Sequence, residues 1–134
     1  MVDADDVRRE AAPLPRVEER FVRNHMTYRV GQYVFLTVSG DETSLGFAFP
    51  KEERAALVAA EPAKFFLPRT SDLRFNWVEA WLAALDREEL HEIVLDAWRM
   101  VVPKRVAAAY LAEDPLSTAR REQAQHDADG GAAR

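Results

Sequence analysis

The fold of this chain is decided by the stretch Asn76-Trp77-Val78-Glu79-Ala80-Trp81-Leu82 and by the segment Leu85-Asp86-Arg87-Glu88-Glu89-Leu90 that follows it. The apolar residues of the first stretch fit both helical spacing and the alternation of a strand. Asp86 and Glu89, however, form the N-terminal box of a new helix, with Leu85 and Leu90 as its hydrophobic staple. A helix already running would not need that start signal. The sequence therefore predicts a strand over 76–84, followed by a helix that begins at Asp86.

Shorter elements precede this pair. Asp3 and Asp6 have the spacing of a capping box and predict a first helix that Pro13 and Pro15 terminate. Alternating residues predict an antiparallel meander within residues 26–49, a proline-initiated helix follows to about residue 60, and 64–67 is a short strand. The predicted fold class is α+β: an antiparallel sheet of about five strands packed against N- and C-terminal helices, with Trp77, Trp81 and Trp98 as core residues.

Composition limits the class of protein. The 134 residues carry a net charge of −5 and contain no cysteine, which excludes disulfides, thiolate metal sites and cysteine nucleophiles. The N-terminus is acidic, unlike a secretory signal, and no apolar run approaches the roughly 20 residues that span a bilayer. We expect a cytoplasmic protein with one domain over residues 1–112. Residues 113–134 are polar and are expected to form a flexible C-terminal tail.

The order and spacing of many short motifs resemble the MmcQ/YjbR family, whose fold is grouped with the CyaY (frataxin-like) α+β proteins. The resemblance covers roughly residues 3–111. The motifs that carry it are Leu14-Pro15-Arg16-Val17, Tyr28-Arg29-Val30-Gly31-Gln32, Tyr33-Val34-Phe35, Pro50-Lys51-Glu52-Glu53-Arg54, Phe66-Leu67-Pro68, Trp77-Val78, Leu85-Asp86 and the ending from Ala97 to Arg105. The family is commonly labelled DNA-binding and no reaction is firmly attached to it. Family members more often have Gly-Lys where this chain has Gly31-Gln32, which removes a positive charge from that turn.

A basic surface is the first candidate site. Arg20, Arg23 and Arg29 lie in a segment, residues 20–40, that contains no acid, and Lys104 and Arg105 form a second basic group. Arginines near tyrosines are what a nucleic-acid surface uses to bind phosphates and stack bases. The net charge of −5 argues against a dedicated nucleic-acid binder, and a solvated strand face explains the same residues.

A cleft that involves Arg69, Arg74 and Trp77 is the second candidate site, for a small ligand or another protein. The sequence is therefore interpreted as a small non-enzymatic binding or regulatory module, a monomer or weak dimer, that binds duplex DNA weakly and without sequence preference. The alternative is a protein-interaction or small-ligand-binding domain. No cofactor is expected, and no membrane association.

Metal binding and catalysis have weaker support. Glu88-x-x-His91 is a single copy of a motif that di-iron sites use twice, so we expect His91 to be an exposed helix residue. Frataxins hold iron on an acidic first helix, and Asp3, Asp5, Asp6 and Glu10 resemble such a ridge. Capping of the helix explains these acids equally, and Arg8 and Arg9 lie among them. P-loop and Rossmann spacings are absent, and no hydroxyl has an evident base partner.

Overall fold

The computed structural model describes residues 1–113 of the chain, which divides into two compact units, residues 1–102 and 103–134. The first unit contains six strands, three α-helices and two short 3-10 helices. Its elements are, in chain order, α1 (Ala4–Ala11), β1 (Val17–Val22), β2 (His25–Val30), β3 (Tyr33–Val38), β4 (Ser44–Ala48), α2 (Arg54–Ala60), β5 (Phe65–Phe66), η1 (Thr70–Asp72), β6 (Trp77–Trp81), η2 (Leu82–Ala84) and α3 (Arg87–Arg99). The α+β class predicted from the sequence is confirmed.

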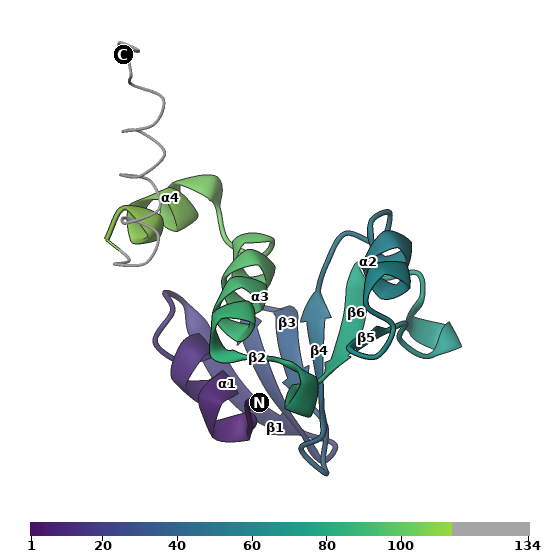
Figure 1. Ribbon diagram of the computed structural model, residues 1–134. Coiled ribbons are helices and arrows are strands. Elements are labelled where there is room, and N and C mark those ends of the chain that lie inside the picture. Colours follow the sequence, from purple (N-terminus) through teal and green to yellow (C-terminus); the bar gives the residue numbers. More distant parts are fainter. Residues whose placement is uncertain (114–134) are drawn as a thin grey trace. The chain divides into compact units, whose positions relative to one another are not determined.

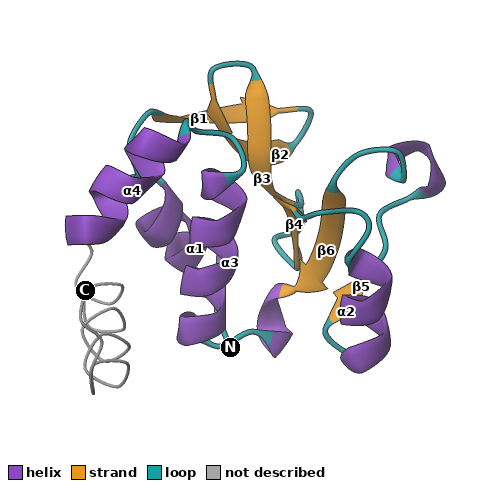
Figure 2. Ribbon diagram, turned by 90° about the horizontal axis from the view of Figure 1, so that it is seen from above, coloured by secondary structure: helices purple, strands orange, loops and turns teal. Residues whose placement is uncertain are grey.

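The six strands form one antiparallel sheet in the order β1-β2-β3-β4-β6-β5. Helices α1 and α3 lie side by side on one face of this sheet (Figures 1 and 2). The strand residues beneath them form an apolar row, Tyr28, Leu36, Phe47 and Val78, which are cross-strand partners in register. We call the opposite side of the sheet the open face, because no helix of residues 1–102 covers it.

Both helices that cover the sheet begin with the predicted caps. In α1 the Asp3 carboxylate accepts from the amide of Asp6, and the Asp6 carboxylate accepts from the amide of Asp3. Asp86 and Glu89 form the same reciprocal box at the start of α3. Trp98 is fully buried, as predicted, and donates its indole N–H to the carbonyl of Pro15 over 3.0 Å.

Strand β1 is the element that the sequence did not predict. Four of its six residues are exposed, so it has little of the alternation that marks a half-buried strand. Its turn into β2 consists of Arg23 and Asn24, both at positive φ (50° and 68°). Such two-residue hairpin turns usually carry Asn-Gly or Asp-Gly, and the pair Arg-Asn is not a sequence signal for them. The sheet therefore has six strands where about five were expected.

Three side chains differ from their expected environments. Trp77, predicted as a core residue, is only half-buried and lies on the open face. Trp81 is 45% exposed and stacks on Phe66, with ring centroids 4.4 Å apart, so it is not a core residue. Strand β6 ends at this residue, and the predicted strand to 84 is wrong because residues 82–84 form the 3-10 turn η2. His91 is not exposed either. Its Nδ1 lies 2.8 Å from Oε1 of Glu10, which joins α3 to α1.

The described part of the second unit is the helix α4 (Lys104–Glu113). The carbonyl of Pro103 accepts the amides of Val106 and Ala107, so the proline starts this helix. The predicted tail, apart from Glu113, lies outside the described residues. Within residues 1–113, none of the helices combines the length and the apolar character that crossing a membrane requires.

Candidate functional site

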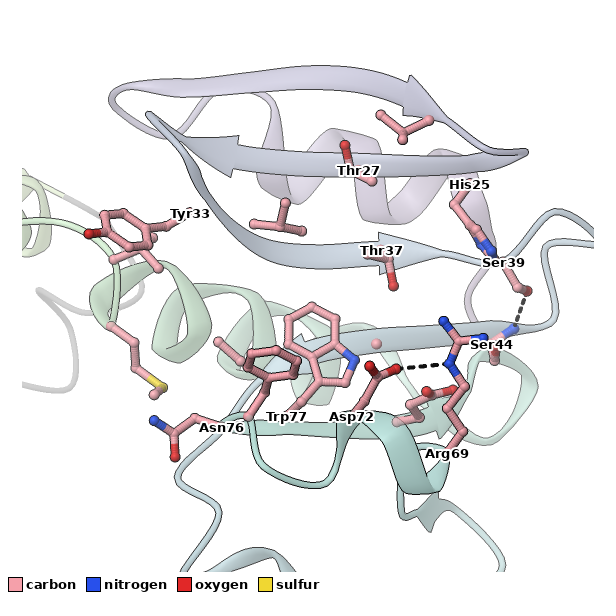
Figure 3. A pocket seen from close by; sticks show the side chains of 18 of the residues that line it. His25, Thr27, Tyr33, Thr37, Ser39, Ser44, Arg69, Asp72, Asn76 and Trp77 are labelled. Atoms are coloured by element: carbon pink, nitrogen blue, oxygen red, sulfur yellow. Dashed lines mark hydrogen bonds and ion pairs between the residues drawn. The ribbon is translucent and has the colours of Figure 1, made fainter.

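The open face of the sheet is hollowed into a groove of about 1080 Å³. Its floor comes from strands β2, β3, β4 and β6, and its walls come from the β1–β2 turn and from the loop between β5 and β6. Figure 3 shows this groove with the side chains that line it. Two of the floor strands, β3 and β4, pack against α3 on the other face of the sheet.

One cross-strand row runs along the open face through all six strands. In register from β1 to β5 its members are Arg20, Thr27, Thr37, Gly46, Glu79 and Phe66. Thr27 is buried, and its hydroxyl donates to the carbonyl of Arg20 over 2.8 Å. The next members of the row form the groove floor.

Gly46 is the centre of that floor. A Cβ atom placed on it would lie 2.7 Å from Nε1 of Trp77 and 2.8 Å from Oγ1 of Thr37, both closer than real contacts allow. The Thr37 hydroxyl and the Trp77 indole both point into the groove (Figure 3). A glycine is therefore required here for the indole to approach the backbone of β4.

Glu79, the cross-strand partner of Gly46, places a half-buried carboxylate in the groove. Burial raises the pKa of this carboxyl, and the nearby Asp72 raises it further, whereas Arg69 and His25 act in the opposite direction. Among residues 1–113 no side chain or amide donates a hydrogen bond to the Glu79 carboxylate. The indole N–H of Trp77 and the hydroxyl of Thr37 likewise form no hydrogen bond with another group of the described chain. Three polar groups that line the groove thus have no hydrogen-bond partner among residues 1–113.

The wall between β5 and β6 is anchored by Arg54 at the start of α2. Its guanidinium donates to the carbonyl of Phe75 over 2.9 Å, to that of Trp77 over 3.1 Å and to that of Leu73. The Asn76 side chain also accepts the amide of Lys51 over 3.0 Å. Arg54 therefore holds the wall through its backbone carbonyls, and the side chain of Asn76 adds a second anchor.

The rim of the groove carries basic residues on two sides. Arg23 and His25 lie at the β1–β2 turn, and Arg69 lies on the opposite wall. Nε of Arg69 bonds Oδ2 of Asp72 over 3.0 Å (Figure 3). The groove thus has an acidic, aromatic floor and a rim of mixed charge.

Comparison with known proteins agrees with this fold. The family model described as YjbR matches residues 12–100, which is more than half of the chain. The chain belongs to the YjbR family. A crystal structure of the Deinococcus radiodurans protein DR2400, which carries a DUF419 domain, superposes with a TM-score of 0.61 at 18% sequence identity, covering 72% of this chain and 75% of that chain. At this identity the likeness shows the fold alone. No curated protein matches the chain.

In this YjbR domain the predicted basic residues are only partly brought together. Arg20 lies on the open face of β1 and bonds Glu18 over 3.5 Å, Arg23 lines the groove, and Arg29 is half-buried on β2 with Glu18 as its cross-strand partner. Lys104 and Arg105 belong to the second unit.

The predicted cleft residues lie closer to one another. Arg69 and Trp77 both line the groove. Arg74 is not among its lining residues, and its guanidinium lies over the ring of Phe75, 4.7 Å from the centroid. Two of the three predicted cleft residues therefore line one groove, and their role in binding a ligand stays a prediction.

Thr37, Gly46 and Glu79 were missed as site residues. The alternation in the decisive stretch held one usable signal, because a strand over 77–81 places Glu79 between Trp77 and Trp81 on one face. A carboxylate between two tryptophans is unusual for a core face. The positions of Thr37 and Gly46 beside it follow only from strand register.

The acidic first helix of this YjbR domain uses its carboxylates internally. Asp3 and Asp6 cap the helix, Arg9 bonds Asp6 over 2.7 Å, and Glu10 contacts His91. The Asp6 backbone hydrogen bond with Asp3 and the charge of Arg87 hold the pKa of Asp6 below its usual value. In the described residues, no three histidine or acidic side chains are grouped as metal ligands would be.

Proposed function

We propose that this YjbR domain is a non-enzymatic binding module that takes up a small ligand in the groove on the open face of its sheet. One observation carries the proposal: the carboxylate of Glu79, the indole N–H of Trp77 and the hydroxyl of Thr37 line one groove, on the two strands that pair with the strand of Gly46, and none has a hydrogen-bond partner from residues 1–113.

Physical chemistry favours a ligand at this point. Small-molecule sites are concave, mostly apolar and supplied with a few convergent polar groups, and they typically measure about 300–1,000 Å³. A partly desolvated polar group without a partner costs roughly 1–3 kcal/mol. A ligand that bonds to Glu79, Trp77 and Thr37 would recover part of that cost. The apolar remainder of the ligand would contact the aromatic rings.

Support for a non-enzymatic role comes from the hydroxyl groups near the groove. Those of Ser39 and Thr43 donate to Oδ1 of Asp41 over 2.8 Å and 2.7 Å. These bonds hold the pKa of Asp41 below its usual value, so this carboxylate is a weak base that stabilises the β3–β4 turn. An acid–base pair of the kind that activates a nucleophile is not formed there.

The proposal is tested by NMR on the full chain with a library of small heteroaromatic compounds. Binding in the groove should shift the Trp77 indole N–H and the amide of Gly46, and Thr37→Val should weaken the hits at least threefold. The control is Trp81→Phe, on the same strand as Trp77 but outside the groove lining, which should leave affinity unchanged. Compounds that shift only residues of α1 and α3 would contradict the proposal.

DNA binding through Arg20, Arg23 and Arg29 is the second candidate. The observation in its favour is that all three belong to one hairpin, β1 and β2 with their turn. Glu18 lies beside two of these arginines and reduces the local positive charge. This candidate is therefore the weaker of the two, and its test is given below.

A further inference from the structure

The groove floor has a specific hydrogen-bonding pattern, and this pattern limits the chemistry of its ligand. An ionised carboxylate accepts only, and its two oxygens suit two parallel N–H donors. Glu79 is such an acceptor, half-buried and not bonded by any donor of residues 1–113. The complementary ligand therefore presents two adjacent N–H groups on one edge.

Aromatic rings flank that carboxylate. Trp77 lies two residues before Glu79 on the same face of β6, and Phe66 is the cross-strand partner of Glu79 on β5. Phe75 lines the same groove from the adjoining loop. Rings in these positions favour a flat, unsaturated ligand, because stacking a base on an aromatic side chain contributes roughly 1–3 kcal/mol.

Two ligand classes carry paired N–H donors: cationic guanidinium or amidine groups, and neutral bases. The charges at the rim of the groove favour one of them. A guanidinium or amidine would match Glu79, but it would leave Arg23 at the rim without an anionic partner, whereas Arg69 is already paired with Asp72. A neutral base that carries an anionic substituent matches both regions. The donor edge of such a base bonds Glu79 in the floor, and its anionic substituent lies near Arg23 at the rim.

Among the nucleobases, guanine alone presents two adjacent donors on its pairing edge, N1–H and the N2 amino group. Adenine presents one donor beside an acceptor, and so does cytosine. The acceptors O6 and N7 of guanine also suit the hydroxyl of Thr37. A volume of about 1080 Å³ is ample for a nucleotide.

We propose, resting on the function proposed above, that the groove binds a guanine base linked to a phosphate, with the two N–H donors on Glu79, the ring beside Trp77 and Phe66, and the phosphate at Arg23. Such a base can come from a free nucleotide or from single-stranded nucleic acid. Both sources share this chemistry.

The test is a calorimetric titration of the full chain with GMP, IMP and AMP. GMP should bind at least tenfold more tightly than AMP. IMP, which lacks the N2 amino group, should lie between them. Glu79→Gln should weaken GMP at least tenfold and remove the preference over AMP, because its amide offers one acceptor and repels one donor. The matched control Glu52→Gln, exposed and outside the groove, should bind GMP as the parent does.

Equal affinities for GMP and AMP, or a Glu79→Gln variant that binds GMP like the parent, would overturn the inference. If Glu79→Gln does not fold, the affinities of the parent for GMP and IMP decide whether the N2 amino group is recognised. The single strands TTGTT and TTATT distinguish the two sources: tighter binding of TTGTT than of GMP assigns the base to nucleic acid, and the reverse assigns it to a nucleotide. If other compounds shift the NMR resonances of groove residues but GMP does not, the guanine assignment alone is refuted. If no compound binds in the groove, the proposed function is refuted as well.

Discussion

Gly46 lies directly beneath the indole of Trp77, so that a methyl group in place of its hydrogen would come within 2.7 Å of Nε1. The two residues are on neighbouring strands, β4 and β6, and the glycine is buried. The groove floor therefore exists because one residue in a β-strand has no side chain.

Gly46→Ala should destabilise the domain by about 1–3 kcal/mol, the usual cost of overpacking. It should also move the indole N–H resonance of Trp77. Urea unfolding and NMR measure the two effects. Ser44→Ala, on the same strand and face, is the control and should change the stability little. The penalty should shrink when Trp77 is replaced by Ala as well; an undiminished penalty would show that the indole is not what the methyl group meets.

Trp98→Ala should cost roughly 3–5 kcal/mol, because it removes a fully buried ring and the donor to the Pro15 carbonyl. Trp81→Ala is the matched comparison, since that indole is 45% exposed. It should cost far less in the same denaturation experiment. Equal losses would mean that Trp98 is not the centre of the core.

Arg54→Ala should cost about 1–3 kcal/mol, because three carbonyls of the groove wall lose their donor. Arg54→Lys should recover little, since an ammonium group cannot reproduce the guanidinium fork. Denaturation measures the loss, and the Trp77 indole resonance reports displacement of the wall. Arg74→Ala in the same loop is the control, and it should change stability by no more than about 0.5 kcal/mol.

The stability difference between the parent and Glu79→Gln should depend on pH. Burial raises the pKa of Glu79 in the folded state above its ordinary value of 4.5. The folded state therefore binds this proton more tightly than the unfolded state does. The stabilisation that the proton gives is fully present below pH 4.5 and is lost as pH rises through the folded pKa. Relative to Glu79→Gln, the parent should become less stable from pH 4 to pH 7 in parallel urea titrations. A stability difference that does not change with pH would mean that the Glu79 carboxylate is fully hydrated.

If DNA binds the β1–β2 hairpin, binding should be weak, indifferent to sequence and steeply dependent on salt. Contacts to about three phosphates imply a slope of log affinity on log salt near −3, at roughly −0.9 per contact. Changing Arg20, Arg23 and Arg29 together to Ala should abolish binding, as measured by fluorescence anisotropy at low and moderate salt. The control removes three charges, Arg8, Arg9 and Arg87, from the helical side. Equal losses in both triple variants would indicate a nonspecific charge effect.

Local signals in the sequence were enough to predict the helices α1 and α3 and most of the sheet. Asp3 with Asp6 and Asp86 with Glu89 are reciprocal caps whose bonds join residues three apart, so no distant partner is needed to read them. The buried Trp98 followed from helical periodicity. Family membership was also contained in the order and spacing of these local motifs.

Strand β1 and the groove could not be derived in the same way. The residues of β1 are mostly exposed, and the strand exists because β2 offers it a free edge. Thr37, Gly46 and Glu79 come from three strands and become neighbours only through register, which no local pattern encodes. The sequence by itself determined the elements and the buried face, because caps and periodicity act within a few residues. Only the tertiary structure decided the groove, because its polar floor depends on which residues face one another across the sheet.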